Sequence, residues 1–379
     1  MPTESKGAGD QWVLQFCHGY DGPFLDCARQ YAALFAGSPY KICTVYLTGA
    51  PDEEVVTGSA SDEVIFLAYN SKQIRGLKLD AIRRIRQIVG DGRDFRFCIA
   101  HRFKPIFISL MATNLPVIGI HHAFGVYNRV MRRWFVNLHR SRLLLLGVSD
   151  AVRDDIRARL PNWPPTHIQT LYNRIDVDSV QHDQLSKEEA RAFLGLPMNI
   201  WIIGNVGRLH PDKDQKTLIQ GFAVALPTLP PQSKLVIMGN GRLEGELKAL
   251  VDQLGLSGNV HFAGQVKNGR RYFKAFDAFA LTSDHEPFGM VLLEAMAAGV
   301  PIVSSDCGGA AEIVSGLGSL FPLCEPRALA ECLVELSSYS TEELEALRRL
   351  MLKKLYENYS DDSVRSCFFD VLAERNYAR

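Results

Sequence analysis

The sequence predicts an α/β protein built from two doubly wound, Rossmann-like domains of parallel strands. Short apolar runs rich in β-branched residues alternate with stretches of helical periodicity along the chain. This series is interrupted at 171–180, where no period is sustained. A length of 379 residues also exceeds what one hydrophobic core usually organises. We therefore expect a first domain at 1–175, a second at 176–360 and a C-terminal helix at 361–379, for which a return to the first domain is one option.

Each expected element follows from its local pattern. In the first domain the apolar runs predict strands at 12–17, 42–47, 64–67, 97–100, 117–121 and 143–148, and helices at 23–35, 77–89, 105–113, 127–138 and 151–160. In the second they predict strands at 201–206, 235–238, 260–262, 278–282 and 302–304, and helices at 215–226, 243–254, 269–276 and 288–298. Two further helical stretches, 341–359 and 363–377, complete the chain.

Composition excludes several classes of protein. No run of about 18 apolar residues occurs, and the polar start lacks the basic and apolar regions of a secretory signal, so we expect a cytoplasmic protein. The eight cysteines form no C-x-x-C pair, which argues against a disulfide framework or a zinc site. A net charge of zero, with no nucleic-acid-binding motif, argues against a nucleic-acid partner.

The segment "EPFGMVLLEAMAAG" at 286–299 predicts an anion site at the start of a helix. Glu286 precedes the helix expected at 288–298, and Gly289 lies in its first turn. The backbone N–H groups of Phe288, Gly289, Met290 and Val291 would therefore favour a phosphate. Glu294 lies two turns into an apolar helix, where a ribose with paired hydroxyls would give it partners. The alternative is that Glu294 is a solvated position on the helix.

Three earlier strand ends add to this site. "GNVGRLHPDKDQ" places Arg208 after one strand and Lys213 before the next helix, where both cations would reach a diphosphate, unless they are ordinary surface residues. "LVIMGNGRLEGEL" places Gly239 where backbone can approach a ligand, but Glu244 stands where a dinucleotide fingerprint needs its third glycine. "FAGQV" places Val266 where backbone suits a nucleobase edge.

The first domain offers a glycine turn and a histidine pair. Gly22 lies in the turn after the first strand, in "HGYDGPFLD". His121 and His122 end the strand at 117–121, where histidine can position a hydroxyl or transfer a proton, or simply serve the fold. No third ligand lies in metal-binding register, so we expect no metal.

The stretch 127–142 contains five arginines and no acidic residue. Arg129, Arg132 and Arg133 alternate there with Trp134 and Leu138, a pattern typical of a helix on an anionic membrane surface. A peripheral position on the inner face of the cell membrane follows from this interpretation, and a solvated charged face is the alternative.

Across 204–314, the motifs "VGRLHPDKDQKTLIQGF", "IMGNGRLEGELKALVDQLGLSGNVHFAGQV" and "TSDHEPFGMVLLEAMAAGVPIVSSDCGGAAEIV" resemble the family-four retaining glycosyltransferases, including bacterial lipopolysaccharide-core and envelope-glycan enzymes. The resemblance implies GT-B architecture, with two domains facing across a cleft, and transfer of a hexose from a nucleotide-diphosphate sugar to a glycan or lipid-linked acceptor.

By that resemblance Arg208 and Lys213 hold the diphosphate of the donor, which is expected to be UDP-linked, and Glu294 holds the ribose. Glu286 contacts the transferred sugar, and His121, or failing it His122, lies beside the reacting carbon. The resemblance implies no cofactor besides the donor.

Two other functions remain open at this point. A nicotinamide-dependent oxidoreductase on a doubly wound fold would need the glycine that Glu244 replaces. A noncatalytic scaffold would use the basic helix to lie on a membrane surface.

Overall fold

The computed structural model describes residues 10–22, 24–375 and 377. The chain divides into two compact units. Unit 1 is Met1–Leu171 with Arg365–Arg379, and unit 2 is Tyr172–Val364.

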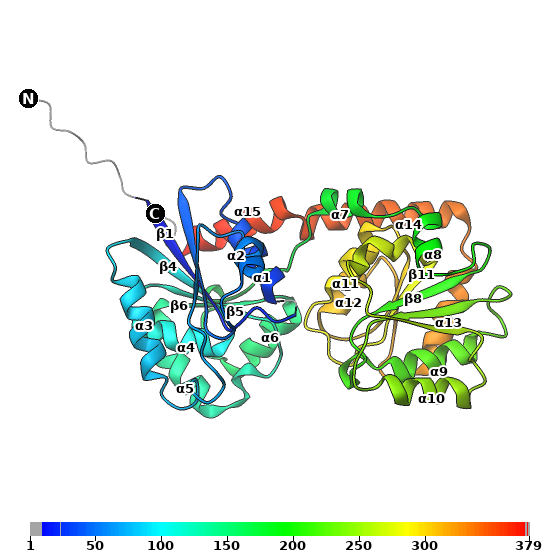
Figure 1. Cartoon of the computed structure of the whole chain (residues 1–379), viewed down its shortest axis with the longest axis horizontal. Coiled ribbons are helices and arrows are strands. Elements are labelled where there is room, and N and C mark those ends of the chain that lie inside the picture. The colour runs from blue at the N-terminus through cyan, green and yellow to red at the C-terminus, as the bar shows by residue number, and fades with distance from the viewer. Residues whose placement is uncertain (1–9, 23, 376, 378–379) are drawn as a thin grey trace, which may run out of the picture. The chain divides into compact units, whose positions relative to one another are not determined.

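The described part of unit 1 contains a seven-stranded parallel sheet with the order β3-β2-β1-β4-β5-β6-β7 (Figure 1). The strands are β1 (Gln11–Cys17), β2 (Tyr40–Tyr46), β3 (Glu63–Phe66), β4 (Asp94–His101), β5 (Val117–His121), β6 (Leu143–Gly147) and β7 (Ile168–Thr170). The central strands β5 and β6 are buried along their whole length, as continuous apolar runs covered on both faces require. The order reverses between β1 and β4, the position where such folds bind ligands.

Helices cover both faces of this sheet. They are α1 (Phe24–Ala33), α2 (Glu53–Gly58), α3 (Leu79–Val89), α4 (Phe103–Ala112), α5 (Val130–Leu138) and α6 (Asp150–Arg159). Figure 1 shows α1 and α2 on one face and α3, α4 and α5 on the other. The last helix, α15 (Asp361–Glu374), contributes its residues from Arg365 onward to unit 1.

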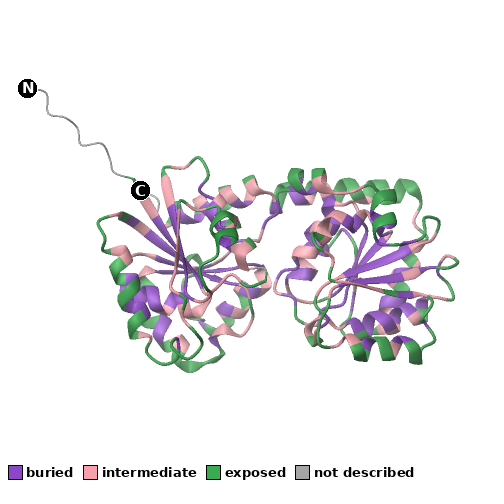
Figure 2. Ribbon diagram, in the orientation of Figure 1, coloured by how far each residue is buried: buried purple, intermediate pink, exposed green. Residues whose placement is uncertain are grey.

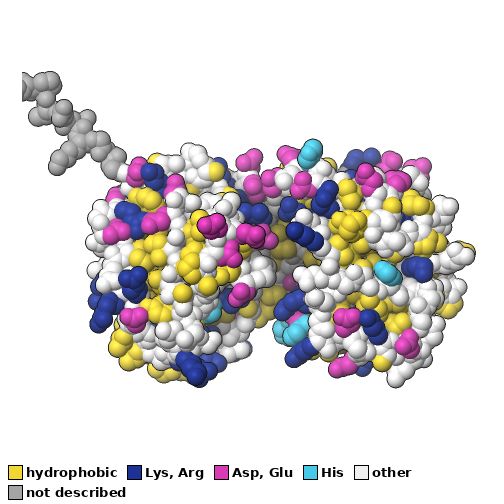
Figure 3. Space-filling view, viewed as in Figure 1, with side chains coloured by type: hydrophobic (Ala, Val, Ile, Leu, Met, Phe, Trp, Pro, Cys, Tyr) yellow, Lys and Arg dark blue, Asp and Glu magenta, His cyan; other side chains and the backbone are white. Residues whose placement is uncertain are grey.

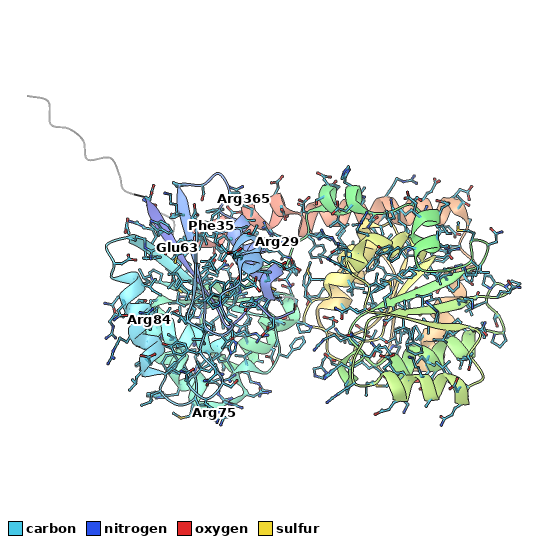
Figure 4. The ribbon with its side chains drawn as sticks, viewed as in Figure 1. Arg29, Phe35, Glu63, Arg75, Arg84 and Arg365 are labelled. Carbon is cyan, nitrogen blue, oxygen red and sulfur yellow. The ribbon has the colours of Figure 1, made fainter. Side chains whose placement is uncertain are left out.

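Aromatic packing fixes α15 on this unit. The ring of Phe35 lies 5.6 Å from that of Phe368 and 5.8 Å from that of Phe369, and Arg365 donates to the carbonyl of Ala36 (Figure 4). The C-terminal segment is therefore part of the first core.

The described part of unit 2 contains a six-stranded parallel sheet with the order β10-β9-β8-β11-β12-β13. Its strands are β8 (Ile202–Val206), β9 (Lys234–Met238), β10 (Val260–Gly264), β11 (Ala278–Leu281), β12 (Ile302–Ser305) and β13 (Ser319–Phe321). Its helices are α7 (Val177–Asp183), α8 (Lys187–Phe193), α9 (Gln215–Ala225), α10 (Glu244–Gln253), η5 (Gly269–Ala275), α11 (Met290–Ala297), α12 (Gly308–Val314), α13 (Pro326–Ser337), α14 (Thr341–Lys354) and η6 (Leu355–Tyr359). Side chains of α9 and α13, such as Phe222 and Leu329, build the core beneath the sheet, and Figure 2 shows the strands as the most buried part.

The expected fold of two doubly wound parallel sheets is confirmed. Several local expectations were wrong. The helix expected at 288–298 begins at Met290, because Gly289 adopts φ 105° and serves as the N-cap residue. The helix expected at 127–138 is interrupted at Arg129. The short elements β7, β13, α2, α7, α8 and α12 were missed because they span only three to seven residues. The twelve-residue helix α13 was also missed, although its buried residues Leu329, Leu333 and Leu336 follow a helical period. Residues 23 and 376, at the ends of two expected helices, lie outside the described residues.

Within the described chain, no helix combines the length and the apolar character needed to cross a bilayer. The same residues contain no cluster of three or more His, Cys, Asp or Glu side chains arranged to hold a metal ion.

Candidate functional site

At the carboxyl edge of the unit 2 sheet, a hollow of about 300 Å³ brings together four of the residues that the sequence singled out. These are Arg208 after β8, Gly239 after β9, Val266 after β10 and Glu294 on α11. The hollow lies at the reversal between β8 and β11, because parallel strands direct their carboxyl ends to one edge. Glu294 is half-buried beside this space, which favours a role at the site over a solvated position on the helix.

Gly239 has a structural reason to be glycine. Its φ is 140°, and a Cβ at this position would lie 1.9 Å from the carbonyl oxygen of Gly207. The loop after β9 therefore packs directly against the loop after β8, with Gly207 N–H donating to Met238 O at 2.9 Å. This contact shapes two walls of the hollow at once.

Lys213 and Glu286 form an ion pair. The Nζ atom of Lys213 lies 2.7 Å from Oε2 of Glu286, and both side chains are largely buried, with exposed fractions of 20% and 9%. The hydroxyl of Ser283 donates to the same carboxylate oxygen at 3.1 Å. Lys213 and Glu286, which were both expected at the site, therefore lie together, and each is already the ion-pair partner of the other.

The start of α11 presents the backbone groups expected to meet an anion. Gly289 precedes Met290 and Val291, and the first N–H groups of a helix have no intrahelical acceptor. Phe288 plays a different part: its side chain is buried, with its ring 5.8 Å from that of Tyr359. It anchors the loop that leads into the helix.

In unit 1 the histidine pair lies at the end of β5, and its two members differ. His121 is 1% exposed, and its Nε2 lies 3.1 Å from the hydroxyl of Tyr127. His122 is more accessible, and its Nε2 lies 3.2 Å from Nδ1 of His101. Burial lowers the pKa of His121 to about 3 and that of His122 to about 4, so both are neutral near pH 7. Gly22 lies exposed in the turn after β1, with open space around it.

Residues 186–349, which include all of the unit 2 site, match the family described as glycosyl transferases group 1. These residues form a group 1 glycosyl transferase domain. The recognition made from the sequence motifs is thereby confirmed.

Relatives by sequence carry the same assignment. The chain is 34% identical over 175 residues to an uncharacterized glycosyltransferase of Methanocaldococcus jannaschii, MJ1607, covering 45% of this chain and 44% of that protein. It is 34% identical over 137 residues to the lipopolysaccharide core biosynthesis mannosyltransferase LpsB of Rhizobium meliloti, covering 34% of this chain and 38% of that one. For the first two curated relatives the match spans 44% and 36% of their own length.

Solved structures share the fold over nearly the whole chain. A glycosyltransferase from Rickettsia africae superimposes with a TM-score of 0.86 at 15% identity, covering 98% of this chain and 100% of that one. Anabaena HepE, solved in complex with UDP, gives a TM-score of 0.81 at 20% identity, covering 96% and 100%. These neighbours establish the GT-B fold beyond the glycosyl transferase domain.

The sequence analysis missed three residues of unit 1 that lie near the pair His121 and His122. They are His18, His101 and Arg102. β4 ends at His101, one residue beyond the expected strand, and Arg102 follows it in a conformation with φ 72° and ψ 165°. A non-glycine residue in this region costs roughly 1–3 kcal/mol, so the fold imposes it. With His18 they line a small hollow at the β1–β4 reversal. The strand-end criterion that identified His121 would have found His101 had the strand been extended by one residue.

Proposed function

We propose that the chain transfers a hexose from a nucleotide-diphosphate sugar, with uridine as the base, to a hydroxyl of a glycan or lipid-linked acceptor. The configuration at the anomeric carbon is retained and no metal takes part. The observation that carries the proposal is the hollow in the glycosyl transferase domain, where Arg208, Val266 and Glu294 meet. It offers a cation for a diphosphate, backbone for a base and a carboxylate for a ribose.

Arg208 is placed to move onto a diphosphate. Its side chain is 72% exposed, and among the described residues its one ion-pair contact is with Asp212, at 3.5 Å. Lys213 lies in the same loop but is held by the largely buried Glu286. We infer that Arg208 closes on the donor, whereas Lys213 acts from a fixed position, as preorganised charge does in other enzymes.

The reaction balances without a protein nucleophile. The acceptor oxygen forms a bond to the anomeric carbon, and the bond from that carbon to the donor phosphate oxygen breaks on the same face. The acceptor proton passes to the departing phosphate oxygen. Glu286 is paired with Lys213, so its carboxylate helps stabilise positive charge on the sugar instead of forming a bond to it. Neutral His122 is the accessible member of the pair and donates or accepts a hydrogen bond at a sugar hydroxyl.

The match to group 1 glycosyl transferases favours sugar transfer over hydride transfer. The structure supplies a further reason: α10 begins at Glu244, where a dinucleotide-binding helix would need its third glycine to pack closely against the sheet.

Thermal unfolding against UDP, ADP, GDP and NADH tests this proposal. A ligand that binds only the folded protein raises the melting temperature, and UDP should do so most. In Glu294→Gln the affinity for UDP should fall roughly tenfold, since one charge-assisted hydrogen bond is weakened. Glu246→Gln, an exposed change on α10, is the matched control. A shift with NADH and none with any nucleoside diphosphate would overturn the proposal.

A second element of the proposal concerns an anionic membrane surface. Six of the nine large apolar side chains that are more than half exposed in the described chain lie on the α3–α5 side of unit 1. They are Leu77, Leu79, Val130, Met131, Trp134 and Leu138. Figure 3 shows hydrophobic and basic side chains together on this part of unit 1. We call these six residues the apolar face.

The helices α3, α4 and α5 are joined by direct contacts. Lys78 Nζ lies 4.8 Å from the ring centroid of Phe107, and that ring lies 4.7 Å from the ring of Phe135 on α5. Arg132 and Arg133 donate to the carbonyls of Val126 and Tyr127, so they hold the preceding loop as well as carrying charge. Arg129 is exposed and is the arginine of this group best placed to meet lipid phosphates.

Sedimentation with phosphatidylglycerol vesicles tests this surface. Met131→Gln combined with Trp134→Gln should abolish most binding, because the exposed apolar area is lost. Phe193→Gln, which removes an equally exposed aromatic ring from α8 in unit 2, should leave it unchanged. Equal binding of the Met131–Trp134 variant and the unaltered protein would refute the assignment.

A further inference from the structure

The carboxyl edge of the unit 1 sheet holds an arginine without an acidic partner. Arg102, at the end of β4, is half-buried, and no carboxylate of the described chain lies within ion-pair distance of it. Its guanidinium lies 3.7 Å from the ring centroid of Phe24, which fixes its position. A partly desolvated guanidinium is costly unless an anion joins it, so the arrangement indicates an absent ligand.

A buried imidazole beside Arg102 also lacks one partner. The Nδ1 atom of His101 lies 3.2 Å from Nε2 of His122, but its own Nε2 is buried with no hydrogen-bond partner among the described residues. His101, His18 and Arg102 line the same hollow, together with the backbone of Gly19. Its enclosed volume is about 10 Å³, so it can admit one polar atom of a ligand whose remainder lies outside it. Buried polar atoms are nearly always satisfied, so this nitrogen is a second sign of a missing polar group.

The surrounding charge is positive. Lys104 lies in the first turn of α4, and its pKa is lowered by burial and by repulsion from Arg132 and Arg75. Arg75 is labelled in Figure 4. His18 has a pKa lowered to about 4 by burial, Lys104 and Arg102, with Asp21 opposing. Asp21 acts on His18, and Asp26 acts on Cys27, which also lines the hollow; Arg102 and Lys104 oppose these two carboxylates and favour an anion.

We propose that this edge of unit 1 binds a phosphate group of the acceptor, with Arg102 and Lys104 supplying positive charge and His18 and His101 supplying neutral hydrogen-bonding nitrogens. Helix α4 begins directly after Arg102, so its first N–H groups, those of Phe103 and Lys104, follow this arginine in the chain. The identification of the ligand as the acceptor rests on the proposed function. The anion site itself rests only on unit 1.

The test is calorimetric titration of the full chain with pyrophosphate, with and without saturating UDP. With UDP present the donor site is filled, and pyrophosphate should still bind. In Arg102→Gln its affinity should fall at least roughly tenfold, the loss expected when a charged hydrogen-bond donor is removed. Arg84→Gln, on α3 and labelled in Figure 4, should bind as the unaltered protein does.

Two further measurements keep the result unambiguous. Lys104→Gln, which leaves the strained residue in place, should also weaken pyrophosphate binding, and thermal melts check that each variant is folded. Dodecyl phosphate and glucose 6-phosphate serve as competitors: displacement by the first supports a lipid phosphate, and by the second a sugar phosphate. If neither competitor displaces pyrophosphate, the proposal is overturned.

The UDP arm separates two kinds of failure. If UDP does not bind but pyrophosphate does, and Arg102→Gln removes it, the proposed donor is wrong and the anion site stands. If UDP abolishes pyrophosphate binding, or Arg102→Gln binds as tightly as the unaltered protein, the site in unit 1 is refuted.

Discussion

Replacing Gly239 by alanine tests how the hollow of the glycosyl transferase domain is built. A Cβ at this position would lie 1.9 Å from the carbonyl oxygen of Gly207, whereas real Cβ contacts almost never fall below 3.0 Å. The loops after β8 and β9 would therefore have to separate by about 1 Å or more. The backbone is also strained for any L side chain at φ 140°.

Steric displacement and backbone strain each cost about 1–3 kcal/mol, so Gly239→Ala should destabilise unit 2 by about 3 kcal/mol. For a domain of this size the melting temperature should fall by roughly 10 °C. UDP affinity should fall as well, because both loops line the hollow.

Gly245→Ala provides the matched control for this change. Gly245 lies six positions further along the chain, in α10, with nothing within 4 Å of a Cβ, and alanine there should stabilise by about 0.5–1 kcal/mol. Thermal unfolding by circular dichroism and UDP titration measure both variants. Equal melting temperatures for Gly239→Ala and the unaltered protein would show that the loops are not packed as described.

Two other predictions concern the cost of a charge on a buried side chain. His121 has a folded-state pKa of about 3 against about 6.5 when unfolded, so its stabilising effect is present above pH 6.5 and is lost as the pH falls toward 3. Between pH 7 and 5 this should cost about 2 kcal/mol in urea unfolding, and His121→Asn should flatten the profile while exposed His182→Asn should not. Lys213→Ala should lower turnover by roughly two orders of magnitude and destabilise by about 3 kcal/mol, because Glu286 is left buried and unpaired. In the double variant Lys213→Ala with Glu286→Gln, most of the stability should return but none of the activity. If stability and activity returned together, Lys213 would have no role in the reaction.

The positions of Arg208, Val266 and Glu294 at one edge could be predicted because each follows a simple rule. Residues just after parallel strands, and those in the first two turns of the next helix, lie near one edge of the sheet. The partners of these residues could not be predicted. Glu286 pairs with Lys213 across 73 positions in the chain, and this depends on how β8 and β11 lie side by side.

Gly239 and Arg102 show two limits of sequence interpretation. The glycine was expected to admit a ligand, whereas its nearest neighbour is the backbone of Gly207. Arg102 adopts a positive φ that its own preferences oppose, so local pattern gives no signal of it. In both cases tertiary packing decides the conformation.

The two sheet edges differ in how their cations are balanced, and this difference has a consequence for ligand selection. In unit 2, Arg208 contacts Asp212, Lys213 pairs with Glu286 and Arg270 contacts Asp183, so a phosphate must compete with a carboxylate for each cation. A small anion gains little from such an exchange, and binding becomes favourable only when a base and a ribose also fill the hollow. Arg102 in unit 1 has no carboxylate to exchange among the described residues. A simple anion should therefore bind at the unit 1 edge, whereas the unit 2 edge should respond only to the complete nucleotide.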